Sequence, residues 1–257
     1  MSTFVKPPLT VSILPCQYAD VPACARISAD AFSTDIHTIV KQLGRKPFDF
    51  EAMSRDSSYE SLHRKNYIYV KAVDSETGDI VGHAGWGFRG VEEDTIPRIG
   101  PIDEKPEQDP ANVKTWSQFN EKEDGEGKEE DSIDRLHNLE DADMQYWMGR
   151  LMPPGTSCMF FLGCTVAPAH QSRGVGSALI KHGASIADSL GLFTWVHSSD
   201  QAWRAYKKFG FEVVGVLDVD LDEFAPSSPK NGGENGDGLW GHYMIRYMKR
   251  MPSSTKG

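Results

Sequence analysis

The sequence predicts an α/β fold in which a mixed β-sheet carries helices on both faces. Segments with the apolar content of strands alternate with segments of helical periodicity along most of the chain. One segment, Met159–Val166, is almost uninterruptedly apolar, as expected of a central strand covered on both faces. Gly191 ends one helical pattern directly before a strand-like segment, and Gly210 ends another. With 257 residues, the chain is long enough to build a sizeable core around such a sheet.

The first part of the chain is expected to supply a strand, two helices and a hairpin. Asp20 followed by Pro22 is typical of the start of a helix. The run Ser75–Asp79 separates two strand-like segments and has the composition of a hairpin turn. The expected elements are the strand Val11–Leu14, a helix from Asp20 to about Phe32, a helix over Ile36–Leu43, and the hairpin strands Asn66–Val73 and Ile80–Phe88.

The second part is expected to alternate helices with strands. Apolar residues recur at helical intervals around Met148 and again around Leu179. The expected elements are the helix Asp141–Leu151, the strand Met159–Val166, the helix Gly174–Leu190, the strand Leu192–His197, a short helix over Ser199–Phe209, and the strands Phe211–Leu217 and Gly241–Met248.

We expect residues 1–257 to form a single domain interrupted by two surface segments. An insertion at about residues 100–135 is strongly acidic, with eleven acidic residues against four lysines over 101–131. Its apolar content is too low to offset the entropy of ordering, so an exposed or flexible loop is predicted. A second loop, at about residues 225–238, is rich in Pro, Ser, Asn and Gly and is also expected to be flexible.

Composition and charge exclude several classes of function. The formal net charge is −10 and the pI is about 5.3, which argues against a nucleic-acid partner because such proteins need positive faces. The longest uncharged stretch, Leu151–Ser172, contains prolines and glycines that forbid one membrane-spanning helix. No signal-peptide-like run precedes Pro15. We therefore expect a cytoplasmic protein with no membrane partner.

The four cysteines are expected to be reduced thiols in such a compartment. None of them is spaced like a metal-binding or redox pair, and no histidines complete a zinc pattern. No metal cofactor is therefore expected. The four residues are Cys16, Cys24, Cys158 and Cys164.

A candidate phosphate site lies in the segment Gln171–Gly176, between a predicted strand and a predicted helix. Gly174 and Gly176 would let a ligand approach the unpaired backbone N–H groups of the first helical turn, and Arg173 adds a cation. A Walker loop is excluded because Gly176 is not followed by Lys-Ser/Thr, and a dinucleotide fingerprint is weak because Leu179 replaces its third glycine. The alternative is a glycine-softened helix start without a ligand.

A second informative segment runs from Trp195 to Phe211 as strand, turn, helix, glycine stop and strand. Ser198 with Gln201 has the spacing of a capping box. Tyr206 lies four positions after Ala202, so the two side chains share one helix face. On this segment alone, Tyr206 is either a packed aromatic residue or a proton donor.

In order and spacing, the two segments resemble the GCN5-related N-acetyltransferase (GNAT) superfamily. The acetyl-CoA signature of that family, Gln/Arg-x-x-Gly-x-Gly/Ala, is matched by Gln171, Gly174 and Gly176. The resemblance covers most of the chain except the acidic insertion and the late loop. The later family block is matched by Ala202, Tyr206, Gly210 and Phe211, with Ser199 where the family usually has Asn.

The resemblance implies a splay between the strand ending at Val166 and the strand ending at His197, with acetyl-CoA bound in it. Its pantetheine arm would pair with the backbone near Thr165 and Val166, and its pyrophosphate would contact the loop and the helix start. The residues implied in cofactor binding are Cys164, Thr165, Val166, Gln171, Ser172, Arg173, Gly174, Val175, Gly176, Ser177, Ser199 and Tyr206.

The resemblance also implies catalytic roles. Tyr206 would protonate the departing thiolate, and the N–H of Val166 would stabilise the oxyanion. The strand Met159–Val166 has no carboxylate, although several relatives place their base on it. The base stays open: His83 is the first candidate, His197 the second, and a base acting through water is an equal alternative.

The function implied is acetyl transfer from coenzyme A to an amine of a small molecule by direct attack. A protein or peptide amine, or a silent acyl-CoA-binding module, is the alternative, and the protein would be a monomer or a homodimer. The acceptor is expected near Ile36–Leu43, Asp141–Leu151 and Gly85–Phe88. Four aromatic residues could line its pocket or belong to the core: Trp86, Phe88, Tyr146 and Trp147.

Overall fold

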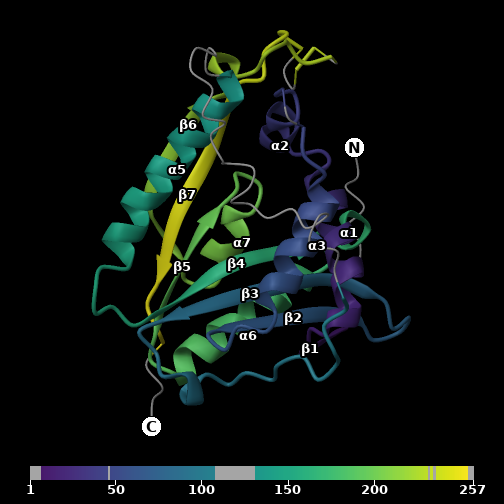
Figure 1. The fold of residues 1–257 in the computed structure, drawn as a ribbon, viewed down its shortest axis with the longest axis vertical. Helices are drawn as coiled ribbons and strands as arrows, with labels where there is room; N and C mark the ends of the chain where they lie inside the picture. Colours follow the sequence, from purple (N-terminus) through teal and green to yellow (C-terminus); the bar gives the residue numbers. More distant parts are fainter. Residues whose placement is uncertain (1–6, 46, 108–130, 231, 234–235, 254–257) are drawn as a thin grey trace.

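The computed structural model describes residues 7–45, 47–107, 131–230, 232–233 and 236–253, which fold around a seven-stranded mixed sheet (Figure 1). The strand order is β1-β2-β3-β4-β5-β7-β6. The β4/β5 pair is parallel, and the other neighbouring pairs are antiparallel. The strands are β1 Val11–Pro15, β2 Tyr67–Asp74, β3 Ile80–Arg89, β4 Cys158–Val166, β5 Phe193–Ser198, β6 Glu212–Asp220 and β7 His242–Arg250.

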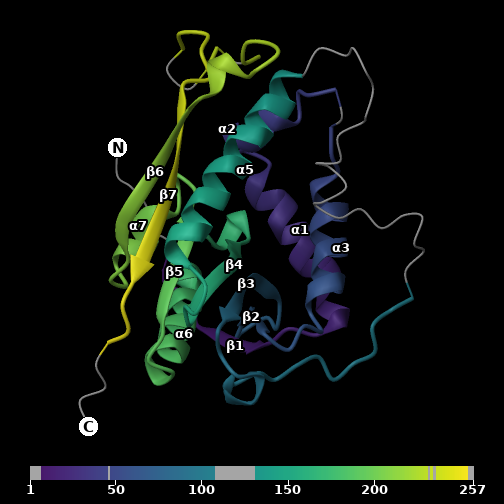
Figure 2. The same cartoon turned by 60° about the vertical axis from the view of Figure 1, so that its left-hand side comes forward.

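Helices cover both faces of the sheet, as predicted. Helices α1 and α3 lie on one face of the β1–β4 half, and α6 lies on the other (Figure 1). Figure 2 shows α5 running beside β7. The α-helices are α1 Val21–Phe32, α2 Ile36–Lys41, α3 Phe50–Ser61, α5 Ser132–Leu151, α6 Val175–Ser189 and α7 Trp203–Lys207. Short 3₁₀ turns are η1 Tyr18–Asp20, η2 Glu93–Thr95, η3 Pro168–His170 and η4 Leu221–Glu223.

The largest core cluster lies between α6 and the sheet. Val175 and Leu179 of α6 are fully buried against it, and burying each such side chain contributes about 1.5–3 kcal/mol. Trp86 of β3 is also fully buried, and a Cβ at Gly183 would lie 2.4 Å from its ring. A glycine at position 183 is therefore what lets α6 pack directly on the β3 indole.

The sheet splits between its two central strands. β4 and β5 pair only from Cys158↔Phe193 to Phe160↔Trp195, whereas β4 stays paired with β3 as far as Val166. A bulge leaves Leu162 without a partner in that ladder. Figure 1 shows the two strands diverging beyond their common start. The splayed mixed sheet expected from the sequence is therefore confirmed.

Several boundaries differ from the prediction. α5 begins at Ser132, not near Asp141, because Asp131 caps the helix by accepting from the N–H of Ile133. α3 was not predicted, since its sequence is polar and only Met53, Asp56 and Tyr59 are buried in it. Within the segment Ser199–Phe209, only Trp203–Lys207 is α-helical.

The acidic insertion expected at about residues 100–135 is attached to the fold at both ends. Asp103 accepts hydrogen bonds from the N–H groups of Tyr18 (2.9 Å) and Ala19 (2.8 Å). Lys105 forms an ion pair with Glu60 at 2.6 Å. From Ser132 the chain is already helical, and residues 108–130 lie outside the described residues.

The later loop, at about residues 225–238, forms bends and turns where the structure describes it. It is followed by Trp240, whose N–H donates to Asp222 at 2.9 Å. No helix in the described part of the chain combines the length and apolarity needed to cross a bilayer.

Candidate functional site

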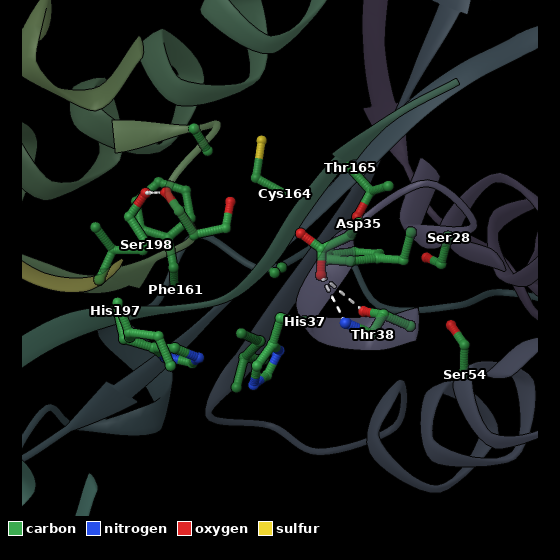
Figure 3. Close-up of a pocket in the computed structure, with 18 of the residues that line it drawn as sticks. Ser28, Asp35, His37, Thr38, Ser54, Phe161, Cys164, Thr165, His197 and Ser198 are labelled. Carbon is green, nitrogen blue, oxygen red and sulfur yellow. Dashed lines mark hydrogen bonds between the residues drawn. The ribbon is translucent and has the colours of Figure 1, made fainter. Parts of the chain in front are cut away.

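A cavity of about 580 Å³ opens where β4 and β5 separate, a volume typical of sites for small molecules, which are about 300–1,000 Å³. Residues from α1, α2, α3, α5, α7 and the six strands β2 to β7 line it. Figure 3 shows side chains from both sides of the splay, among them Cys164 and Thr165 of β4 and His197 and Ser198 of β5. The splay thus produces an internal chamber between the two halves of the sheet.

Two residues of β4 present unpaired backbone to this gap. The N–H of Ala167 bonds to the carbonyl of Val81, and the carbonyl of Thr165 lies against Gly82. Because a trans peptide directs its N–H opposite to its C=O, the N–H of Val166 points away from β3. The alternation of the ladder directs the amide of Cys164 the same way.

The loop after β4 leads into an uncapped helix N-terminus. Ser172 (φ 61°) and Gly174 (φ 91°) are left-handed, and no side chain caps α6 at Gly174. The N–H groups of Val175, Gly176 and Ser177 fall in the first helical turn, which has no intrahelical partners. Together with the helix dipole, they form a site that suits an anion.

Further contacts fix this loop. Gln171 Nε2 donates to the carbonyl of Val166 at 3.1 Å, which ties the loop to the end of β4. Arg173 Nε donates to the carbonyl of Pro7 at 3.1 Å, and the carbonyl of Arg173 accepts from the N–H of Leu9 at 2.9 Å. The guanidinium is thus attached to the N-terminal segment beside the helix start.

Gly176 leaves open space that the fold itself does not use. A Cβ there would meet only Val166 Cγ2, at 3.6 Å, which is an ordinary contact. The packing therefore does not require a glycine at this position. Space above bare first-turn N–H groups is what a pyrophosphate needs to reach the backbone, so these residues fit coenzyme A.

Tyr206 of α7 presents its hydroxyl to the cavity. The side chain is 5% exposed, and its ring packs edge-on against Phe161 at 5.1 Å and against Phe211 at 5.5 Å. Its hydroxyl is hydrogen-bonded to the thiol of Cys164. Burial, and then the neighbouring Cys164, raise the pKa of Tyr206 well above its usual value. The phenol is therefore a protonated, fixed hydroxyl at neutral pH.

Cys164 itself is not a reactive thiol. Burial raises its pKa to about 12, although the hydrogen bond from Tyr206 opposes the shift. The thiolate that nucleophilic chemistry needs is thus scarce at neutral pH. All four cysteines are free thiols in the structure.

His83 lines the cavity, and its ring is hydrogen-bonded to two partners. Nε2 lies 3.0 Å from Ser28 Oγ, and the ring also hydrogen-bonds the backbone of Cys24. Burial lowers the pKa of His83 to about 4, and the bond to Cys24 opposes this only in part. A ring held in this way fits a structural role better than that of a proton acceptor.

Acidification is expected to destabilise the fold through His83. The ring takes a proton near pH 6.5 in the unfolded chain but only near pH 4 in the folded one. His83 therefore does not lower the free energy of unfolding above pH 6.5. As the pH decreases from 6.5 to 4, its protonation in the unfolded chain lowers this free energy by at most about 3 kcal/mol. Urea unfolding at pH 7 and pH 4.5 should show a smaller loss in His83→Gln than in the wild type. Equal losses would contradict this assignment.

The remaining predicted residues of β5 and its turn also reach the cavity. His197 lines the chamber, and the surrounding protein lowers its pKa, while Glu140 acts in the opposite direction. Ser199 hydrogen-bonds the hydroxyl of Tyr243, so in this structure it faces a neighbouring strand.

The four aromatic residues considered for an acceptor pocket do not line the cavity. Trp86 and Phe88 are core residues, at 0% and 3% exposure. Trp147 stacks on Tyr247 at 5.0 Å between their ring centroids, and Tyr146 is exposed on α5. For Trp86 and Phe88, the alternative of core packing is confirmed.

Sequence reasoning missed a charged cluster in the cavity wall. Glu140 of α5 contacts His37 of α2 and accepts from Lys41 Nζ at 2.7 Å. Burial alone would raise the pKa of Glu140, but His37 and Lys41 lower it to about 2. The two helices are remote in sequence, so no local motif signals the cluster. It is a consequence of α5 folding back over α2.

An aromatic wall was missed for the same reason. Phe32 of α1 stacks on Phe50 of α3 at 5.2 Å, and Phe48 lies 6.0 Å from Phe50. All three line the cavity and are only partly buried. Because α3 was not predicted, the sequence did not indicate that these three rings would lie together.

Comparison with known proteins agrees with these motifs. Residues 118–211 match the family model described as Acetyltransferase (GNAT) family. A search of curated proteins gave no match. Because residues 118–130 lie outside the described part, the match is seen in the structure from α5 to Phe211, the residue before β6.

Solved structures share the fold at low sequence identity. A histone acetyltransferase HPA2 and related acetyltransferase from Corynebacterium glutamicum has a TM-score of 0.54 and 18% identity, covering 97% of this chain and 100% of that one. The apo form of a mutant agmatine N-acetyltransferase has a TM-score of 0.53 and 14% identity, covering 94% and 99%. Residues 118–211 thus match the GNAT family model, and the described part of the chain has the fold of these solved acetyltransferases, as the resemblance in the sequence predicts.

Proposed function

We propose that this protein transfers an acetyl group from acetyl-CoA to an amine of a small molecule. The observation that carries the proposal is the splay between β4 and β5, which has an uncapped, glycine-lined helix start at one end and a buried phenol in its wall. Acetyl-CoA would supply the activated thioester. The chain would supply binding, orientation and proton transfer.

Binding uses backbone that the fold leaves free. The pyrophosphate would be held by the N–H groups of Val175, Gly176 and Ser177 and by the loop Gln171–Gly174, which includes Ser172 and Arg173. The outward amide of Cys164 is suited to pair with a pantetheine amide, as an added strand would, which leaves the N–H of Val166 for the thioester carbonyl. Thr165 and Ser199 lie beside this path in the cavity wall.

Proton transfer uses the groups fixed in the chamber. The hydroxyl of Tyr206 holds a proton at neutral pH and would give it to the sulfur as the carbon–sulfur bond breaks. The outward N–H of Val166 would donate to the carbonyl oxygen as negative charge develops on it. Both groups belong to rigid elements, so they need no rearrangement during the reaction.

The cavity wall favours a small, partly apolar amine as the acceptor. Phe32, Phe48 and Phe50 present apolar surface, while Asp35 and Glu140 add negative charge. A partly open cavity with apolar walls and a few polar groups is typical of small-molecule sites. The negative groups would favour a cationic ammonium over a neutral or anionic acceptor.

An acceptor screen tests this proposal. Release of free thiol from acetyl-CoA is measured with a pool of small primary amines, with a pool of peptides, and with tertiary amines as the control that cannot form an amide. Mass spectrometry identifies the acetylated product. Release with the small primary amines supports the proposal. Release with peptides alone indicates a protein acceptor, and acetyl-CoA binding without release with any amine indicates a silent binding module.

A further inference from the structure

We propose that His37, held by Glu140, is the base that removes a proton from the acceptor's amine, a role that presupposes the acetyl transfer proposed above. His37 lies on α2, outside both sequence motifs, and lines the chamber together with Tyr206 and Cys164. Figure 3 shows the rings of His37 and His197 at the cavity.

The His37 ring is fixed by two neighbours. Nε2 contacts the Oε1 atom of Glu140, and the ring stacks on Tyr243 with centroids 4.7 Å apart and planes at 15°. Tyr243 is anchored in turn, because its hydroxyl donates to Asp35 at 2.9 Å. The side chain of His37 is only 14% exposed. A base held this firmly keeps one orientation toward the chamber.

The contact with Glu140 defines which nitrogen is basic. The pKa of Glu140 is held near 2, so this carboxylate is ionised and can only accept hydrogen bonds. Nε2 of His37 must therefore carry the hydrogen, which leaves the lone pair on Nδ1. Among the described residues, Nδ1 has no hydrogen-bond partner. A carboxylate oriented against one nitrogen while the other accepts a proton is the arrangement that hydrolytic triads use.

The other histidines of the chamber wall are less suited. The ring of His83 is held by Ser28 and by the backbone of Cys24, and burial lowers its pKa to about 4. His197 has no carboxylate in contact among the described residues, and burial lowers its pKa. His37 alone of the three combines a direct carboxylate partner with an unbonded second nitrogen.

Charged and titratable groups surround His37 from every neighbouring element. The groups are Asp35 and Lys41 from α2 and its cap, His137, Glu140 and Asp141 from α5, Tyr243 from β7, and His197 from β5.

His37 and Tyr206 together account for every proton that moves in the reaction. Nδ1 of His37 takes one proton from the acceptor ammonium, and the neutral nitrogen then forms its bond to the acetyl carbon. As the carbon–sulfur bond breaks, the sulfur takes a proton from Tyr206. The nitrogen loses a second proton, which restores the phenol, and the proton on His37 leaves to solvent. One proton is released for each amide formed.

Substitution of His37 tests its role as a base. His37→Gln keeps an N–H donor near Glu140 but removes the proton acceptor. We expect kcat to fall about 10- to 100-fold, on the scale of a lost general base, while acetyl-CoA affinity measured by calorimetry stays within about twofold. The matched control is His242→Gln, because His242 makes a 2.7 Å contact with Asp218 on the surface, away from the chamber. The control should leave kcat unchanged.

Glu140 is a positioning residue, and Glu140→Gln gives an independent readout. Loss of the carboxylate removes the acceptor that holds the hydrogen on Nε2, so the ring is no longer fixed in one tautomer. We expect kcat to fall about 10-fold, while acetyl-CoA affinity stays within about twofold. In nitrogen NMR of the free protein, the wild-type His37 should carry its hydrogen on Nε2, whereas the variant should show a mixture of the two tautomers.

The outcomes separate this role from acetyl transfer itself. Wild-type activity in His37→Gln, or an Nδ1–H tautomer of His37, overturns the assignment of the base and leaves the proposed function intact. Absence of thiol release by the wild-type protein with any amine overturns both. A 10- to 100-fold loss in His37→Gln, with the control unchanged and the tautomer of His37 mixed in Glu140→Gln, supports the assignment.

Discussion

Replacement of Tyr206 with phenylalanine is expected to lower kcat by about 10- to 1,000-fold, because it removes the proton that the sulfur needs as it leaves. The ring keeps its packing against Phe161 and Phe211, so the fold is retained. Acetyl-CoA should bind nearly as tightly as to the wild type, since the phenol contributes chiefly as the thiolate forms. Steady-state thiol release and calorimetry measure the two quantities separately.

A buried tyrosine outside the chamber provides the control for this variant. Tyr59 is 7% exposed, close to the 5% of Tyr206, but it packs against Tyr18 under α1. Tyr59→Phe should keep the wild-type kcat. If Tyr206→Phe also keeps it on the true acceptor, Tyr206 is a packing residue and the sulfur takes its proton from water or from the acceptor ammonium.

Replacement of Gly176 with glutamate is expected to weaken acetyl-CoA binding about 100-fold. The new side chain would fill the space above the first turn of α6 and place a negative charge against the pyrophosphate. Loss of about two charge-assisted hydrogen bonds, each worth about 1.5 kcal/mol, gives this factor. The melting temperature should change little, because a Cβ at this position meets only Val166 Cγ2 at 3.6 Å.

Two further variants show whether the loss of affinity depends on the position of the new side chain and on its charge. Gly149 lies on the exposed face of α5 with open space around it, so Gly149→Glu should leave acetyl-CoA affinity unchanged. Gly176→Ala should lie between wild type and Gly176→Glu, since it adds bulk without charge. Unchanged affinity in Gly176→Glu by calorimetry would show that the pyrophosphate binds elsewhere.

The central part of the fold could be predicted because its signals are local. The apolar run Met159–Val166, the glycines at 174 and 176, and the stop at Gly210 each act within a few residues of their own element. Their order also defines the topology, since a parallel β4/β5 pair requires a crossover helix between them. The structure accordingly places β4, α6 and β5 close to the predicted boundaries.

The acceptor side of the chamber could not be predicted because its contacts are remote. α3 is polar, and its start depends on Asp49 accepting from the N–H of Ala52, a weak signal without its tertiary partners. His37 and Glu140 become neighbours only when α5 returns across α2. The sequence could supply His83 as a candidate base, but not the bonds to Ser28 and Cys24 that engage its ring.

The most direct test of this account is a crystal structure of the protein with coenzyme A. We predict that the pyrophosphate contacts the N–H groups of Val175 to Ser177 and that the pantetheine arm pairs with Cys164 between β4 and β5. The sulfur should lie beside the hydroxyl of Tyr206, in place of its contact with Cys164. Coenzyme A bound outside the splay would contradict the account. So would a structure in which Tyr206 keeps its contact with Cys164 while coenzyme A binds at another place.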